Sequence, residues 1–415
     1  MKKFKIVTLG CRTNQYESQG YAHQLKGLGY VQAEEGEAAD VCIVNTCTVT
    51  ESADSSSRHQ IRQLIRENAG AKIAVTGCMA ESAPEAIRGL GDQIHLVSNA
   101  NKEELVSELF PEETLPEFKI EAFEGHTRAF VKVQDGCNSF CTYCTIPYVR
   151  GRSRSRQMAE VVDEVKGLIA NGYKEVVITG INVGDFDGGG RLADLVRAID
   201  ALPGLERLRI SSIDPDEIDD DLADAVLNGK TTCPSMHIVL QSGSNVILKR
   251  MYRKYSRQVF LETCEKMVLK NPDFTVTTDI IVGFPGETEA DFADTVDVMQ
   301  KVQFAKVHMF PYSPRKRTRA ALYPNRVPPE VIRERKQELL RLAERGAFEL
   351  RQRFVGRKMP VLLEDSEKMN NSKEFLSGHT ANFLKVFVDA KGHQPNEIIE
   401  CTLVENTPEG LIGRC

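Results

Sequence analysis

The 415-residue sequence lacks any long apolar run, and no stretch approaches the roughly 18 apolar residues that a membrane span needs. The N-terminus begins basic, but the apolar stretch that follows it is far too short for a secretory signal. Tryptophan is also absent, which excludes no class of protein. With 41% apolar and 27% charged residues, these absences predict a soluble, cytoplasmic globular protein of two or three domains.

The chain also lacks a net positive charge, since 59 acidic residues outnumber 53 basic ones. The basic residues are unevenly placed: residues 315–358 hold fourteen Lys and Arg against five Glu, although the whole chain carries −6. A second run contains Arg150, Arg152, Arg154 and Arg156 without an acidic residue. One such run alone fits a solvated helix face, but two in an acidic protein favour a polyanionic partner.

The eleven cysteines do not indicate a disulfide framework, because a reducing compartment disfavours one. Three of them, Cys11, Cys47 and Cys78, each end a strand-like run, and helix-like segments at about 16–28 and 52–68 separate these runs. This alternation predicts a parallel sheet, in which ligands bind beyond the carboxyl ends of the strands. A lone cysteine there is usually a small buried hydrophobe. Three in equivalent places predict a shared metal centre, whereas Cys42, inside its strand, is expected to pack. Cysteines without metal-ligand spacing are interpreted as structural or exposed: Cys233, Cys264, Cys401 and Cys415.

The middle of the chain follows a Pro- and Glu-rich stretch, residues 111–126, which is interpreted as a linker. Strand-like runs then alternate with segments long enough for helices, at 129–133, 175–179, 207–211, 236–240, 274–281 and 306–310. Six such units predict a partial parallel (β/α)6 barrel, with its site at the carboxyl ends of the strands.

The end of the chain is helical and basic from 328 to 353, and it then contains short strand-like runs at 359–363, 381–388 and 398–403. These runs predict a small antiparallel β-barrel, a shape that many RNA-binding modules use. The sequence therefore predicts an α/β protein with domains at 1–112, 123–352 and 354–415.

One loop directly after the first barrel strand carries the strongest chemical signal. It has the spacing Cys-x3-Cys-x2-Cys, with Cys137, Cys141 and Cys144, and no further Cys or His follows at metal spacing. Four ligands would complete an electron-transfer cluster or a structural zinc site, so three leave one position of a cluster open. The alternative is a zinc knuckle completed by a remote ligand.

Together these motifs resemble the radical S-adenosylmethionine (SAM) methylthiotransferase family over essentially the whole chain. The matching positions include Gly10, Cys11, Asn14, Ser18, Asn45, Cys47, Gly77, Cys78, Gly136, Cys144, Pro147, Gly151, Gln241, Ser244, Asp279, Gly283, Gly286, Phe310 and Ser313. The resemblance implies two [4Fe–4S] clusters: an auxiliary one on Cys11, Cys47 and Cys78, and a SAM-cleaving one on the central loop. It also implies a C-terminal TRAM domain that binds RNA.

The resemblance further suggests which residues hold SAM. Tyr143 lies where the superfamily contacts adenine, and three barrel strands end in further candidates: Thr179, Gly180, Ser212 and Gln241. Each could instead be an ordinary residue of a βα turn. One departure from the family pattern is Arg317, which stands where the family usually has Gly.

The subtype that the sequence resembles, the MtaB type, acts on N6-threonylcarbamoyladenosine at position 37, in the tRNA anticodon stem-loop. By resemblance the enzyme adds a methylthio group at C2, and it needs a reducing electron donor and a sulfur donor. Arg152, Arg154 and Arg156 are candidates for the threonylcarbamoyl carboxylate, although they could equally contact tRNA phosphates. The alternatives are methylthiolation of isopentenyladenosine or of a ribosomal-protein aspartate, or a non-catalytic iron–sulfur RNA-binding protein.

Overall fold

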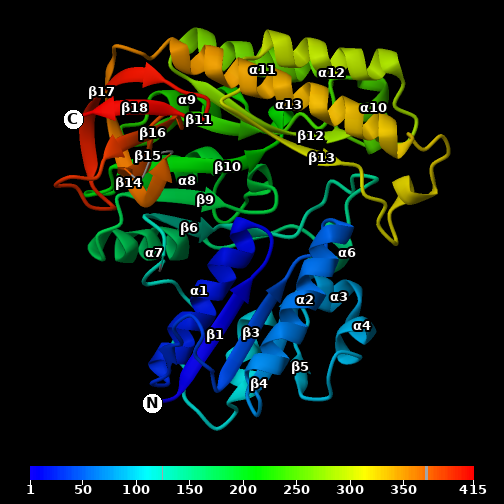
Figure 1. Cartoon of the computed structure of the whole chain (residues 1–415), viewed down its shortest axis with the longest axis vertical. Helices are drawn as coiled ribbons and strands as arrows, with labels where there is room; N and C mark the ends of the chain where they lie inside the picture. The colour runs from blue at the N-terminus through cyan, green and yellow to red at the C-terminus, as the bar shows by residue number, and fades with distance from the viewer. Residues whose placement is uncertain (124, 370–372) are drawn as a thin grey trace.

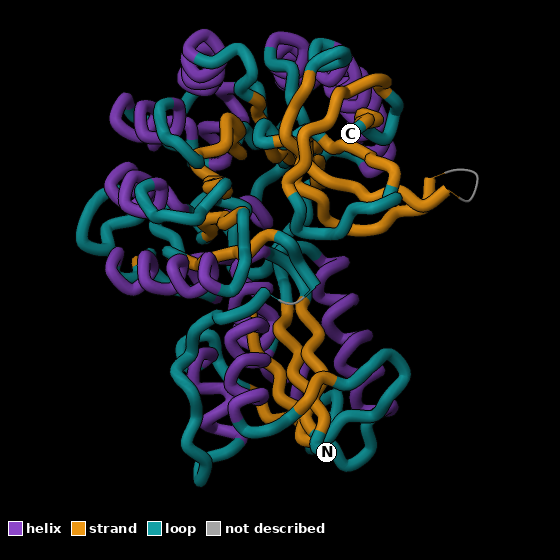
Figure 2. Tube along the Cα trace, turned by 90° about the vertical axis from the view of Figure 1, so that its left-hand side faces the viewer, coloured by secondary structure: helices purple, strands orange, loops and turns teal. Residues whose placement is uncertain are grey.

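The computed structural model describes residues 1–123, 125–369 and 373–415, and these form three packed bodies (Figure 1). An N-terminal α/β domain lies at one end of the long axis, and a large parallel sheet with its helices lies at the other. The third body, a closed β-barrel, packs beside the large sheet (Figure 2). Glu124, within the expected linker, lies outside the described residues.

The N-terminal domain is a five-stranded parallel sheet in the order β2-β1-β3-β4-β5. Its strands are β1 (Lys3–Thr8), β2 (Val31–Gln32), β3 (Val41–Thr46), β4 (Lys72–Gly77) and β5 (Ile94–Leu96). Its helices are α1 (Arg12–Gly27), α2 (Glu51–Glu67), α3 (Cys78–Ser82), α4 (Pro84–Arg88) and α5 (Leu105–Leu109). Every residue of β3 is buried, as expected for a central strand with both faces covered. Cys42 packs there with no exposed surface, as predicted.

The central domain is a six-stranded parallel sheet in the order β13-β12-β11-β10-β9-β6, which confirms the predicted partial barrel. The strands are β6 (Arg128–Lys132), β9 (Glu175–Thr179), β10 (Arg207–Ile213), β11 (Thr232–Ile238), β12 (Thr275–Val282) and β13 (Lys306–Pro311). The helices are α7 (Met158–Ala170), α8 (Leu192–Asp200), α9 (Asp220–Leu227), α10 (Asn245–Met251), α11 (Arg257–Lys270) and α12 (Glu289–Lys301). Because β6 and β13 do not pair with each other, the barrel stays open on one side.

Short elements complete the central domain. A helix α6 (Ile146–Val149) and a two-stranded ribbon of β7 (Gln134–Asp135) and β8 (Arg154–Ser155) flank the three-cysteine loop. Single 3-10 turns are η1 (Lys102–Glu104), η2 (Val183–Asp185), η3 (Pro215–Glu217) and η4 (Arg319–Leu322).

The C-terminal body begins after α13 (Pro329–Gln352) and is a closed five-stranded barrel in the order β14-β15-β16-β18-β17. Its strands are β14 (Lys358–Met369), β15 (Lys373–Thr380), β16 (Lys385–Asp389), β17 (Ile398–Asn406) and β18 (Leu411–Arg414). The predicted small barrel is confirmed, although β16 pairs with β18 in parallel. The strand expected at 381–388 begins only at Lys385, because Phe383 takes a left-handed φ of 65° in the turn after β15.

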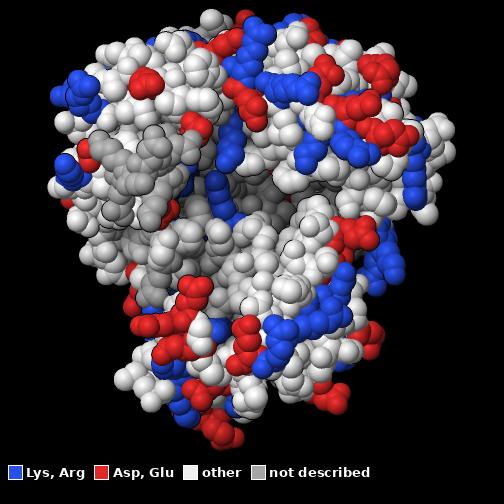
Figure 3. Space-filling model, in the orientation of Figure 1, with Lys and Arg blue, Asp and Glu red and all other residues white. Residues whose placement is uncertain are grey.

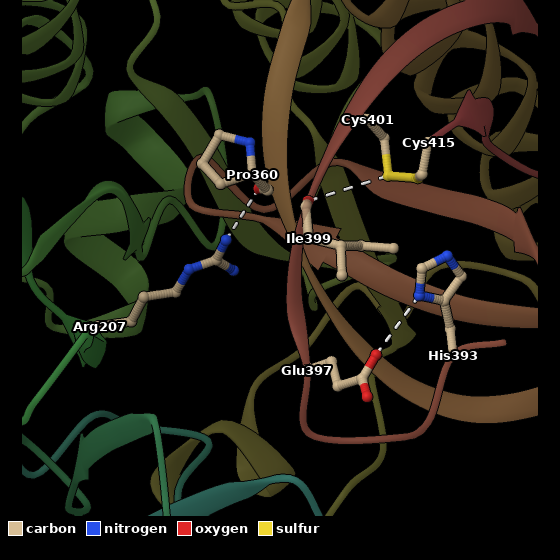
Figure 4. The surroundings of a disulfide bond; sticks show 7 residues. All are labelled: Arg207, Pro360, His393, Glu397, Ile399, Cys401 and Cys415. Carbon is tan, nitrogen blue, oxygen red and sulfur yellow. Dashed lines mark hydrogen bonds and ion pairs between the residues drawn. A yellow bond between two sulfur atoms is a disulfide. The ribbon is translucent and has the colours of Figure 1, made fainter.

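The C-terminal barrel is docked firmly onto the central domain. Arg207 donates hydrogen bonds of 2.8 Å to the carbonyl oxygens of Pro360 and His379, the first of which Figure 4 shows. A disulfide between Cys401 and Cys415, which the sequence did not predict, links the middle of β17 to the last residue (Figure 4). The tail is therefore an integral part of the fold rather than a tethered module.

The expected domain limits fall between these three bodies, and we propose them as boundaries. Within the described ranges, no helix has both the length and the apolar character needed to cross a bilayer.

Candidate functional site

The N-terminal sheet brings Cys11, Cys47 and Cys78 to one edge. They follow β1, β3 and β4, which are adjacent in the sheet and pair in register, for example Thr46 with Gly77. Cys47 packs so closely on Gly10 that a Cβ there would lie 2.8 Å from the Cys47 sulfur, and Gly10 has a φ of 96°. A side chain is therefore excluded at position 10. The fold thus produces the convergence that the strand pattern predicted.

A buried arginine connects this edge to the central domain. Arg150 follows α6 and has no exposed side-chain surface, and its guanidinium donates to Glu17 at 3.1 Å and to Asp135 at 2.9 Å. It also donates to the side chain of Asn14 in the first turn of α1. Lys102 pairs with both carboxylates, at 2.6 Å from Glu17. We call Glu17, Lys102, Lys132, Asp135 and Arg150 the interface network.

The interface network keeps its charges because each carboxylate faces several cations. Burial alone would raise the pKa of Glu17, but Arg150, Lys102 and Lys132 lower that pKa to about 2. Burial raises the pKa of the Cys78 thiol, and the nearby charge of Arg150 opposes this. Arg150 thus places a positive charge beside the sheet-edge cysteines, where it favours the thiolates that ligate metals.

The three-cysteine loop, residues 137–144, is fixed by its own backbone. Gly136 has a φ of 72°, and a Cβ there would lie 2.1 Å from the carbonyl oxygen of Arg152, so only glycine fits. The amide of Ser139 donates to the Cys137 sulfur and that of Ile146 to the Cys144 sulfur, both at 3.4 Å. Amide donors of this kind stabilise cluster-bound thiolates.

A cavity of about 210 Å³ adjoins the loop at the carboxyl ends of the barrel strands. Its lining includes all three loop cysteines, and also Tyr143, Ser212 and Gln241, which the sequence singled out. Gln241 has a left-handed φ of 62°, and its side-chain oxygen is buried without a hydrogen-bond partner among the described residues. A strained residue with an unsatisfied acceptor at a cavity wall is typical of a ligand contact.

Two expected SAM contacts do not line this cavity. Thr179 is buried and accepts a hydrogen bond from Ser211, and Gly180 packs on Gln134. The residues that do line the cavity there are the next two in the chain, Ile181 and Asn182. The sequence pointed to the end of β9, but the residues that line the cavity there come from the turn after the strand.

An arginine that the sequence did not single out lies against the middle cysteine of the loop. Arg253 follows α10, has a mostly buried side chain, and donates to the Cys141 sulfur at 3.1 Å. Its second amino group pairs with Asp214 at the end of β10. Both residues line the cavity. No sequence pattern marked this pair, because the partners lie 39 residues apart in different turns.

The pKa of Glu217, which lies near this pair, is raised, whereas that of Glu17 is lowered. Burial and the charge of Asp214 raise the pKa of Glu217 to about 7, against a weaker opposing hydrogen bond from Asn182. Glu217 therefore changes protonation near neutral pH, whereas Glu17 stays ionised.

The donor sets are groups of buried thiols, which fit a positively charged metal centre such as an iron–sulfur cluster. Burial raises the pKa of Cys144 to about 12 and that of Cys47 to about 11, so each group of thiols needs an added positive charge to ionise. In the described ranges, no three Cys, His, Asp or Glu side chains are gathered tightly enough for one metal ion. A four-iron cluster holds its cysteine sulfurs further apart than a zinc ion does.

The three candidate substrate arginines lie in different surroundings. Arg152 is exposed and its guanidinium lies 4.3 Å from the centre of the Phe140 ring. Arg154 is half exposed and donates to Asp135 at 3.2 Å. Arg156 already pairs with Glu164 at 2.7 Å. The structure therefore leaves Arg152 and Arg154 more accessible than Arg156.

The wider surface around the site is concave and partly basic. In the space-filling view a hollow lies between the N-terminal domain and the central barrel, with Lys and Arg atoms at its rim (Figure 3). Of the basic stretch 315–358, Arg315 pairs with Asp54, Arg335 with Glu287, and Arg357 with Asp273, so part of its charge stabilises the fold.

Two family models match the chain. The first, described as Uncharacterized protein family UPF0004, covers residues 3–98, and the Radical SAM superfamily covers residues 131–299. These ranges contain the sheet-edge cysteines and the three-cysteine loop respectively.

Solved structures share the fold. The radical SAM methyltransferase TsrM from Kitasatospora setae matches with a TM-score of 0.55 at 15% identity, over 74% of this chain and 73% of that one. The cobalamin-dependent radical SAM enzyme OxsB matches with a TM-score of 0.53 at 11% identity, over 84% of this chain and 58% of that one.

Curated relatives match nearly end to end. A threonylcarbamoyladenosine tRNA methylthiotransferase MtaB from Chlamydia pneumoniae is 50% identical, over 99% of this chain and 97% of its own length. An MtaB from Thermotoga maritima is 38% identical over 100% and 97%. A tRNA-2-methylthio-N(6)-dimethylallyladenosine synthase from Caldicellulosiruptor saccharolyticus is 36% identical over 99% and 92%. With its fold, its two three-cysteine sites and these relatives, the chain belongs to the radical SAM methylthiotransferase family, whose members use SAM and two [4Fe–4S] clusters.

Proposed function

We propose that this enzyme adds a methylthio group to C2 of N6-threonylcarbamoyladenosine at position 37 of tRNA. The observation that carries the proposal is the 50% identity to the Chlamydia pneumoniae enzyme over both chains, against 36% to the dimethylallyladenosine synthase. The docked N-terminal domain supports it, because the interface network joins the domain of the sheet-edge cysteines to the flank of the three-cysteine loop.

In this proposal Cys137, Cys141 and Cys144 hold the cluster that binds SAM, and Cys11, Cys47 and Cys78 hold the auxiliary cluster. Bound SAM would supply the methyl group and the radical that removes hydrogen from an unactivated carbon. The chain itself positions these groups. Arg253 stabilises the Cys141 thiolate, and the unsatisfied oxygen of Gln241 faces the cavity that SAM would fill.

The remaining contacts to SAM come from both the expected and the newly found lining. Tyr143 and Ser212 line the cavity directly. Thr179 and Gly180 would act through the turn that presents Ile181 and Asn182.

The RNA partner would bind across the hollow and the basic surface of α13. Exposed Arg333 and Arg341 on that helix, with the docked C-terminal barrel, form the proposed contact to the anticodon stem-loop. Because the barrel is integral to the fold, charge reversal on α13 tests this better than truncation does. A reducing electron donor, a sulfur donor and a cytoplasmic location follow from the proposed reaction.

Mass spectrometry of nucleosides in tRNA from cells lacking the gene tests the proposal. We expect 2-methylthio-N6-threonylcarbamoyladenosine to disappear and its unthiolated precursor to accumulate. If the methylthio-isopentenyl nucleoside disappears instead, the enzyme belongs to the dimethylallyl subtype. Unchanged tRNA nucleosides together with lost thiolation of a ribosomal protein would identify the protein-modifying subtype.

A further inference from the structure

A second cavity, of about 100 Å³, lies further from the three-cysteine loop than the first, here called the deeper cavity, and its wall includes cationic groups, among them the exposed Lys306. Three bodies of the molecule contribute to its wall: Arg12 from the start of α1, Lys306 and His308 from β13, and Phe383 from the C-terminal barrel. Strands β10 and β11 add Arg209 and His237.

Only some of these cations are neutralised within the protein. Arg209 forms an ion pair with Glu175 at 2.9 Å and donates to the Ala381 carbonyl oxygen at 3.1 Å. His237 lies 3.4 Å from Asp279 and 2.9 Å from the Thr277 hydroxyl.

Arg12 and Lys306 have no such partner. Among residues 1–123, 125–369 and 373–415, no carboxylate oxygen lies within 4.0 Å of either side chain. Arg12 instead lies over the Phe130 ring, at 5.3 Å from its centre. Two unpaired cations that line one small cavity form a site for an anionic group.

This cavity belongs to the same lumen as the cluster site. Along β12, Thr277 lines the deeper cavity and Ile281 lines a cavity at the cluster end, with Asp279 between them. Along β13, Lys306 and His308 line the deeper cavity and Phe310 the outer one. One inward-facing layer of a strand advances about 7 Å, so a group several bonds away from the reacting carbon reaches the deeper layer.

We propose that Arg12 and Lys306 bind the carboxylate of the threonylcarbamoyl group and thereby select this substrate. The inference rests on the proposed function. With C2 of the adenine presented at the cluster end, the N6 substituent projects away from it and places its terminal carboxylate among the unpaired cations. An apolar isopentenyl group would offer neither cation a partner, and it would leave the partly buried guanidinium of Arg12 unpaired, which is unfavourable.

This proposal places the carboxylate on other residues than the three arginines that follow the three-cysteine loop. Arg156 and Arg154 already contact Glu164 and Asp135, and Arg152 stacks on Phe140 outside the barrel. The charges around the site also indicate which way the substrate is oriented. Asp279 lies on the cluster side, so the substrate's carboxylate would lie on the side of Arg12 and Lys306.

Binding of RNA to the reconstituted holoenzyme tests the inference without relying on turnover. The probes are synthetic anticodon stem-loops with threonylcarbamoyladenosine, unmodified adenosine or isopentenyladenosine at position 37. We expect the native protein to prefer the first about tenfold, and we expect Lys306→Met and Arg12→Gln each to remove most of this preference. Their affinity for the unmodified stem-loop should change less than about twofold, and Lys306→Arg should keep the preference.

Controls separate the carboxylate from phosphate contacts and from cluster loss. Lys301→Met, on the outer helix α12, should leave all three affinities unchanged. Iron content and SAM cleavage must stay native in Lys306→Met, which lies away from the cysteines in sequence. If Lys306→Met and Arg12→Gln weaken all three stem-loops equally, or if Arg154→Leu alone removes the preference, the inference is overturned.

Failure of the proposed function has a different signature. If the native holoenzyme thiolates only isopentenyladenosine in these stem-loops, the proposed substrate is wrong. If it thiolates threonylcarbamoyladenosine while both variants keep the native preference, only the carboxylate site is wrong.

Discussion

The two three-cysteine sites differ in what holds them together. The central loop places its cysteines within residues 137–144 and fixes them with hydrogen bonds from its own amides. The sheet-edge site takes one cysteine from each of three turns, and it exists only because β1, β3 and β4 are neighbours. A local site tolerates changes in distant packing, whereas a distributed site depends on the whole domain.

Arg150 makes the sheet-edge site dependent on the flank of the central loop. It follows the central loop in sequence, yet its guanidinium lies in the N-terminal domain beside Cys78. The loop's own flank therefore supplies charge to the distributed site, and the dependence runs in one direction.

The largest expected effect comes from exchanging the cysteines of each site. Cys141→Ala should abolish SAM cleavage, because it removes a proposed ligand of the cluster that binds SAM. Cys47→Ala should keep SAM cleavage but abolish methylthiolation, and each variant should lose about half of the iron. Iron analysis and mass spectrometry of deoxyadenosine and of thiolated nucleoside measure these outcomes.

Cys42→Ala is the matched control for this comparison, since Cys42 is buried inside β3, near the opposite end of the strand from Cys47. It should keep both iron and activity. Full iron content in Cys47→Ala would show that the auxiliary site is assigned wrongly.

The next largest effect concerns Arg150, which connects the N-terminal domain to the central loop. Arg150→Met leaves the buried carboxylates of Glu17 and Asp135 with less compensation, and it should lower the free energy of unfolding by about 3–5 kcal/mol. Iron should be lost from the sheet-edge site before the central loop. Chemical denaturation and iron-release kinetics measure both. Arg154→Met, a half-exposed neighbour, should cost below about 1 kcal/mol.

The pH dependence should also distinguish the sites. The pKa of Glu217 is raised from 4.5 to about 7, so the folded state binds more protons and stability falls as pH rises through this window. Between pH 5 and 8 the free energy of unfolding should therefore fall less in Glu217→Gln than in the native protein, by about 2 kcal/mol. Glu17, with its pKa of about 2, contributes stability that is lost only as pH falls from about 4.5 towards 2. Unfolding curves across pH 3–8 measure both; an unchanged slope in Glu217→Gln would contradict the assignment.

The smallest effect tests the family position that here holds Arg317. Its φ is 69°, a left-handed conformation that favours glycine, which explains why relatives with glycine avoid strain there. Arg317→Gly should stabilise the protein by about 0.5 kcal/mol, since relief of strain outweighs the added entropy of the unfolded chain. A thermal shift is the measurement. Lys316→Gly, without that constraint, should destabilise slightly.

Local patterns determined much of this protein. The alternation of strands and helices specified two parallel sheets and a closing barrel, because side-chain periodicity and turn residues are properties of short segments. The spacing of Cys137, Cys141 and Cys144 specified one site for the same reason, and the strand-end positions of Cys11, Cys47 and Cys78 indicated the second.

The tertiary structure determined which partner each charged side chain has. Arg150 and Arg156 belong to one basic run in the sequence, yet Arg150 pairs with Glu17 of the N-terminal domain, whereas Arg156 pairs with Glu164 on the following helix α7. Arg253 and Asp214 meet at the cluster loop, and Arg12 and Lys306 meet across a cavity, from turns and strands far apart in the chain. Charge pairing depends on distances of a few ångströms in space, which the order of residues along a chain does not contain.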